Sequence, residues 1–128
     1  MTITKSLPPF SLTLEIKLLG SDLLVVLHGG DAPHIGSAVL AQPRPSLRDE
    51  NVISSTSSVI NLLGHKDEAI CRAVAEALCA RFGRVTLCTG GFHVDGITAE
   101  KIATVQALTR ELISAAIFEL EKDFGERP

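Results

Sequence analysis

All four histidines of this chain lie beside a glycine or within two residues of one. Glycine allows backbone conformations with positive φ and lets a ligand approach the main chain closely. Histidine is the side chain best suited to proton transfer or metal ligation near neutral pH. We therefore expect several loops to converge on one polar site. The four segments are His28-Gly29-Gly30, Pro33-His34-Ile35-Gly36, Gly64-His65-Lys66-Asp67 and Gly90-Gly91-Phe92-His93-Val94-Asp95-Gly96.

One of these segments contains a histidine and an aspartate separated by a single residue, His93 and Asp95. In an extended strand both side chains lie on the same face, so Asp95 could orient the imidazole or hold a cation beside it. The spacing matches no standard metal signature such as H-E-x-x-H, and we expect no metal. A metal-dependent enzyme acting on a small molecule is the alternative. Its ligands would come from His28, His34, His65 and His93, with Asp95 or Asp67.

Other residues could bind a phosphate or a flat ring. The backbone N–H groups of Gly90 and Gly91 could face an anion, and Lys66 and Arg44 are candidate phosphate partners. The chain has no tryptophan and no tyrosine. Stacking on a planar ligand would therefore fall to Phe92, to a histidine or to an arginine.

Covalent catalysis has little support in the sequence. The three cysteines, Cys71, Cys79 and Cys88, show no C-x-x-C spacing, and their odd number does not fit a disulfide framework. Cys88 with His93 could form a nucleophile and its base, but a small buried apolar residue is the preferred interpretation. The chain also lacks a G-x-S-x-G elbow and a phosphate-binding P-loop.

The composition predicts one globular domain, residues 1–128, with a core over about 10–122. The chain has 128 residues, is 45% hydrophobic and carries a formal net charge of −3. No basic cluster suggests nucleic acid as a partner. No apolar run is long enough for a membrane span, and no signal-peptide pattern is present, so we expect no membrane partner and a cytoplasmic location.

Hydrophobic periodicity predicts the strands. Residues 10–19 alternate between apolar and polar, which is typical of a strand with one buried face. Leu23 to Leu27 form an apolar run, with His28 at its end, and a third strand is expected from Ile35 to Ala41, before the prolines. Residues 52–63 are β-branched and serine-rich and predict a strand with a hydroxyl-lined face.

Two helices and one further strand follow. Apolar residues recur every three or four positions from Ala69 to Phe82, with Gly83 as the C-terminal stop. Val85 to Thr89 reads as a strand and Gly90 to Gly96 as a loop. Thr98 is the expected N-cap of the second helix, whose buried face would comprise Ile102, Val105, Leu108, Leu112, Ala116 and Leu120.

The fold class expected from this order is α/β: three or four strands, then helix, strand and helix, forming a single-domain sandwich with a mixed sheet. Two helices can cover one face of such a sheet. The uncovered face would need solvent-tolerant side chains or a second subunit, so we expect a homodimer.

Three segments together resemble a known family. They are Gly30 to Val39, Gly64 to Asp67, and Phe92 to Thr98, in this order along the chain. The resemblance, which extends from about Phe10 to about Leu120, is to the small prenylated-flavin chaperones. These are LpdD-like proteins, known as the D subunit of gallate-type hydroxyarylic acid decarboxylases.

The resemblance implies a small α/β protein with a fold related to proteasome-assembly chaperones. It also implies an accessory protein without turnover of its own, which binds prenylated FMN or FMN and helps deliver or mature it for a UbiD-type decarboxylase. The motif positions carried over are His34, Gly36, His65, Lys66, His93 and Asp95. A metal-dependent enzyme and a purely structural assembly chaperone remain alternatives.

Overall fold

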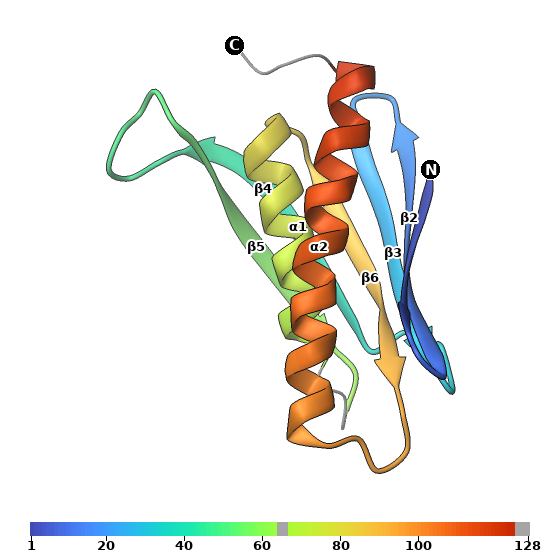
Figure 1. Cartoon of the computed structure of the whole chain (residues 1–128). Helices are drawn as coiled ribbons and strands as arrows, with labels where there is room; N and C mark the ends of the chain where they lie inside the picture. The colour runs from blue at the N-terminus through green and yellow to red at the C-terminus, as the bar shows by residue number, and fades with distance from the viewer. Residues whose placement is uncertain (64–66, 125–128) are drawn as a thin grey trace.

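The computed structural model of the chain describes residues 1–63 and 67–124, which form one mixed sheet and two helices (Figure 1). Along the chain, five strands precede the first helix. The elements are β1 (Thr2–Leu7), β2 (Phe10–Leu19), β3 (Asp22–Gly30), β4 (Ser37–Pro45), β5 (Ile53–Asn61), α1 (Glu68–Phe82), β6 (Thr86–His93) and α2 (Ala99–Phe124).

The strand order across the sheet is β1-β2-β3-β6-β4-β5. The last strand in sequence, β6, is therefore inserted at the centre of the sheet. It runs parallel to β3 and antiparallel to β4, and every other neighbouring pair is antiparallel. The predicted α/β class and mixed sheet are confirmed.

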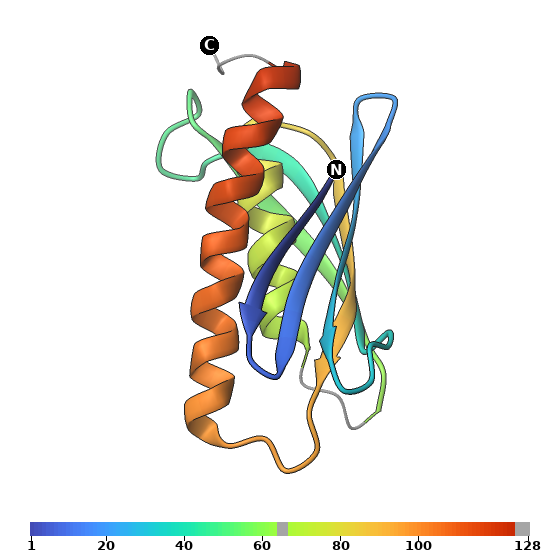
Figure 2. The same cartoon turned by 45° about the vertical axis from the view of Figure 1, so that its right-hand side comes forward.

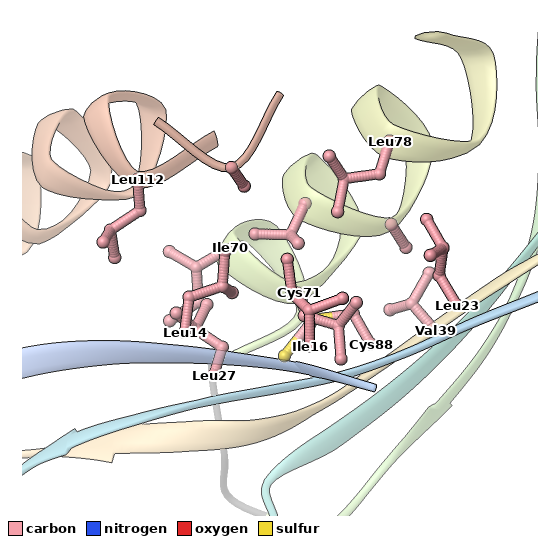
Figure 3. Packing of buried hydrophobic residues seen from close by; sticks show 14 of the residues in the cluster. Leu14, Ile16, Leu23, Leu27, Val39, Ile70, Cys71, Leu78, Cys88 and Leu112 are labelled. Atoms are coloured by element: carbon pink, nitrogen blue, oxygen red, sulfur yellow. The ribbon is translucent and has the colours of Figure 1, made fainter. Parts of the chain in front are cut away.

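Both helices lie on the same face of the sheet (Figures 1 and 2). Helix α1 packs on β4, β5 and β6, whereas α2 packs on β1, β2 and α1. The core fills the space between the two layers and includes Leu14, Leu27, Val39, Leu78 and Leu112, all fully buried (Figure 3). Among the described residues, no helix is long and apolar enough to cross a membrane.

The three cysteines belong to this core. Cys71, Cys79 and Cys88 are buried free thiols. The pKa of Cys88 is raised well above its usual value, first by a hydrogen bond with Cys71 and second by burial. The pKa of Cys79 is raised from 9.0 to about 11, mainly by burial and to a smaller extent by the nearby Glu76 carboxylate. Thiols held neutral in this way act as small apolar residues, as the sequence predicts.

Both helix ends that sequence reasoning assigned are present. The Thr98 hydroxyl accepts a hydrogen bond from the Lys101 backbone N–H over 3.1 Å, which makes it the N-cap of α2. Gly83 adopts a left-handed conformation with φ 64° and donates its N–H to the Cys79 carbonyl over 2.8 Å. Ile102, expected on the buried face of α2, is instead 41% exposed.

One strand was missed, and the predicted extents of β3, β4 and β6 were wrong. The missed strand is β1, although Ile3 and Leu7 alternate with polar residues and pack on the core. Strand β4 continues to Pro45 instead of stopping at the prolines. Its pairing with β6 ends at Ala41, and a proline is tolerated where a strand has a free edge.

The predicted loop over residues 90–96 is in fact strand β6 as far as His93. Gly90 there does not mark a loop; it allows close approach inside the sheet. Gly90 has φ 133°, and a Cβ at this position would collide with the carbonyl oxygen of Leu27 on β3. His28, expected at a strand end, lies within β3, which continues to Gly30.

Candidate functional site

The candidate site lies where the two parallel strands end. Strands β3 and β6 pair in register from Leu23 opposite Thr86 to Gly30 opposite His93, so their carboxyl ends meet at one edge of the sheet. Helices α1 and α2 both begin at this edge (Figures 1 and 2). In α/β proteins, ligands collect at the carboxyl ends of parallel strands.

Asp67 is the central residue of this edge. It directly precedes α1 and is buried, with 6% of its surface exposed. Its Oδ1 accepts a hydrogen bond from the backbone N–H of Phe92 over 3.0 Å, at a point of β6 beyond its pairing with β4. The carboxylate makes no capping hydrogen bond within its own helix. Asp67 therefore completes the free edge of β6 and fixes the start of α1 against it.

His34 pairs with the other oxygen of Asp67. Its Nε2 lies 3.1 Å from Asp67 Oδ2, and its Nδ1 lies 2.9 Å from the carbonyl oxygen of Ala32. A carbonyl oxygen can only accept, so Nδ1 is the donor to Ala32. This contact holds the ring so that Nε2 faces the Asp67 carboxylate.

Two glycines make room for this pair. A Cβ on Gly36 would collide with Asp67 Oδ2, and a Cβ on Gly91 would lie 2.7 Å from both Asp67 Oδ2 and His34 Nε2. Neither glycine has a positive φ, so close approach, not backbone conformation, explains them. The His34-x-Gly36 spacing of the sequence thus reflects a steric requirement of the Asp67–His34 contact.

A second histidine–aspartate pair lies beside the first. His93 Nε2 is 2.8 Å from Asp95 Oδ1, and both side chains are largely exposed. The rings of His34 and His93 meet edge to face, with centroids 6.1 Å apart. The structure therefore brings together His34, His93, Asp67 and Asp95 from three separate segments of the chain.

Other residues singled out in the sequence lie elsewhere. His28, on β3 beside Gly91, contacts Glu15 of β2 at 3.4 Å. Ser37 of β4 pairs with Gly90, and Arg44 lies seven residues further along the same strand. Arg44 donates hydrogen bonds to Thr56 and to the Pro45 carbonyl. His65 and Lys66 lie outside the described residues.

A cavity of about 560 Å³ opens between the end of β6 and the starts of the two helices. Its walls are mostly apolar, with three polar side chains at Asp67, His93 and Gln106. The exposure of Ile102 is explained by its place in this wall. The lining residues are Asp67, Ala69, Ile70, Phe92, His93, Val94, Gly96, Ile97, Ile102, Val105 and Gln106.

Sequence reasoning identified Phe92 and His93 but missed the other side of this cavity. Ile70 and Val105 come from the two helices, where the helical period alone assigns apolar residues to the core. Gln106 is an exposed polar residue of α2, and no pattern in the sequence marks it. The signal for Asp67 was present in its motif, but its hydrogen bond to Phe92 depends on a sheet order that periodicity does not give.

The metal alternative finds no support in the described part of the chain. Within residues 1–63 and 67–124, no three His, Cys, Asp or Glu side chains are grouped closely enough to hold a metal ion. The site histidines are instead engaged in pairs with aspartates.

Comparison with known proteins identifies the family of the chain. Residues 6–121 match the model of the prenylated flavin chaperone LpdD-like domain. The chain is also similar to Protein LpdD of Lactiplantibacillus plantarum (strain ATCC BAA-793 / NCIMB 8826 / WCFS1), at 26% identity over 113 residues. The aligned region covers 87% of this chain and 78% of that protein. The matched region includes all four site residues, and the chain belongs to the prenylated flavin chaperone LpdD-like family.

Proposed function

We propose that the cavity at the ends of β3 and β6 binds prenylated FMN, or FMN, and that the chain hands the cofactor to a UbiD-type decarboxylase. The observation that carries the proposal is the cavity itself, in a chain that belongs to the prenylated flavin chaperones. Its volume of about 560 Å³ is in the range usual for cofactor pockets.

The residues that line the cavity suit a flavin. An isoalloxazine ring system is flat and largely apolar, with hydrogen-bonding atoms along one edge. Ile70, Val105 and Ile102 offer an apolar wall, and Phe92 offers an aromatic ring. His93, Asp67 and Gln106 would hold the polar edge of the ring. The cofactor supplies the reactive chemistry once it reaches the decarboxylase, and the residues here only bind and orient it.

The phosphate would be held by different groups. No described residue lining the cavity is a lysine or an arginine. At the start of α2 the Lys101 N–H is already used by the Thr98 cap, and Gly90 and Gly91 are within β6. Lys66 directly precedes Asp67 in the sequence and remains the candidate of choice for the phosphate. Arg44, far along β4, would serve only from a second chain.

The proposal is of an accessory protein and not of an enzyme. His93, which pairs with Asp95, would offer its imidazole to the ligand from the cavity wall, whereas the three thiols lie in the core and are unsuited to nucleophilic chemistry. The exchange with the decarboxylase would take place in the cytoplasm.

The test is direct titration with FMN and with prenylated FMN, followed by the flavin absorbance and fluorescence. We expect binding with a dissociation constant on the order of micromolar or below. Ile102→Trp, which fills the cavity from its exposed wall, should weaken binding at least about tenfold, or by about 1.4 kcal/mol. His93→Ala should also weaken it.

Phe118→Trp is the matched control, because it makes a similar change on the same helix. Phe118 is 63% exposed and is not among the residues of the cavity wall. Its variant should bind the flavin as the parent does. Absence of binding by the parent to either flavin, or equal binding by the Ile102→Trp variant, would refute the proposal.

A further inference from the structure

The sheet has a second face that neither helix covers. Both helices pack on the side formed by residues such as Leu14, Val25 and Val39 (Figures 1 and 2). Side chains alternate along a strand, so the residues between these point to the other side. No described element lies over them.

The centre of this open face is apolar. Strand pairing aligns Leu24, Leu87 and Leu40 in one cross-strand row, and it aligns Val26, Thr89, Ala38 and Ile60 in the next. Leu40 is 36% exposed and Ile60 is 72% exposed, although both belong to strands of the sheet. A contiguous apolar patch on a stable monomer rarely exceeds a few hundred Å², and larger patches mark interfaces.

The size of the open face matches a standard protein interface. Six strands spaced about 4.8 Å apart, each about 8 residues long at about 3.3 Å per residue, span roughly 760 Å². Stable complexes bury about 800 Å² on each partner. The face can therefore accommodate a whole interface of ordinary size.

The surroundings of the patch favour a second copy of the chain as the occupant. Glu15 and Lys17 border it on β2, and Arg44 borders it on β4. This rim carries both signs of charge, so it selects neither an acidic nor a basic partner. An apolar centre with a rim that carries both signs of charge allows opposite charges on two copies to face each other, as a two-fold interface requires. A partner that binds only during cofactor transfer would leave the patch exposed for the rest of the time.

We infer that two copies of the chain pack sheet against sheet through this face, with Leu24, Val26, Leu87, Ala38, Leu40 and Ile60 at the centre. Two packed sheets about 10 Å apart bury such half-exposed rows in a common core, as in a β-sandwich. The inference specifies the surface of the homodimer and does not rest on flavin binding, because the cavity lies on the helical side of the sheet.

The experiment is sedimentation equilibrium of the full chain without flavin. The parent should sediment at about twice the chain mass of 13.6 kDa at concentrations on the order of 10 μM. Leu87→Glu places two charges in the centre of the interface and should give a monomer under the same conditions. Phe118→Glu, the matched control on the outer side of α2, should remain a dimer.

A milder variant protects the test against misfolding. Leu40→Thr keeps a side chain that is favoured in strands and should raise the dimer dissociation constant at least about tenfold, with circular dichroism unchanged. A monomeric parent would overturn the inference. A dimer that persists in both Leu87→Glu and Leu40→Thr would overturn it too, since the contact would then use a sheet edge or a helix.

Discussion

His34 Nε2 lies 3.1 Å from Asp67 Oδ2, and this contact joins the segment after β3 to the residue that directly precedes α1. The two residues are 33 positions apart in sequence. Asp67 also accepts the Phe92 N–H, so one carboxylate holds together a loop, a helix start and the end of β6. The geometry of the cavity therefore depends on one buried side chain.

Removing that carboxylate should destabilise the fold. Asp67→Ala leaves the Phe92 N–H without its acceptor, and we expect a loss of about 1–3 kcal/mol in the free energy of unfolding by urea. Asp67→Asn keeps an oxygen that can accept from Phe92 and should lose less. Asp95→Ala is the control: this side chain is 91% exposed, and its loss should stay within about 0.5 kcal/mol. Equal losses for Asp67→Ala and Asp67→Asn would show that the hydrogen bond to Phe92 is not the cause.

The glycine at position 91 should be coupled to the same pair. Gly91→Ala introduces a Cβ 2.7 Å from both Asp67 Oδ2 and His34 Nε2, so the two side chains must move and lose their contacts. We expect a cost of about 1–3 kcal/mol in urea unfolding. In a background that already carries His34→Ala and Asp67→Ala, the cost should fall by more than about 0.5 kcal/mol. An unchanged cost in that background would place the strain elsewhere in β6.

The N-cap of α2 offers a prediction on local stability. Thr98→Ala removes the acceptor of the Lys101 N–H and should cost about 1 kcal/mol. Hydrogen exchange of the amides at 99–102 should become faster, because this turn begins the helix beside the cavity. Thr98→Asp retains an acceptor and should behave like the parent. Faster exchange in both variants would show that the side-chain acceptor is not what holds the turn.

The buried thiols predict a dependence of stability on alkaline pH. Burial and Glu76 raise the pKa of Cys79 from 9.0 to about 11 in the folded chain. Below pH 9 the thiol is neutral in both states and contributes no pH dependence. Between about pH 9 and 11 the unfolded chain releases this proton while the folded chain keeps it, so stability falls as the pH rises.

Cys79→Ala isolates this contribution and should flatten the decline in stability between pH 9 and 11, measured by urea unfolding at each pH.

The same burial predicts slow reaction of the three thiols with a disulfide reagent at pH 8 in the native state, and fast reaction of all three in urea. Rapid native modification would contradict the burial of these side chains.

Local patterns predicted much of this fold, because period and capping are properties of short segments. The alternation at 10–19, the stripe of α1, Gly83 and Thr98 are all present as expected. The insertion of β6 between β3 and β4 is a non-local choice, and no window of sequence encodes it. For the same reason, the sequence predicts a loop at Gly90-Gly91, whereas Gly90 allows close packing against β3 and Gly91 makes room for His34 and Asp67.

The site was predictable to the extent that its motifs are local. His93 and Asp95 are two residues apart and contact each other. His34 and Asp67 share one site because β4 and β5 return the chain to the edge where it left β3, which requires the sheet topology. Gln106 and Ile70 face the cavity from helices whose stripes look like ordinary core.

The position of β6 at the centre of the sheet also has a consequence for synthesis on the ribosome. The first 61 residues contain five strands, yet β3 and β4 do not pair with each other. Until residue 93 has been made, each of these two strands presents an open edge, and the sheet exists as two separate pieces. Such edges are templates for pairing with other chains. Nascent chains that stop before β6 should therefore be the most aggregation-prone species of this protein, and long-range insertion of β6 is the step that closes the sheet.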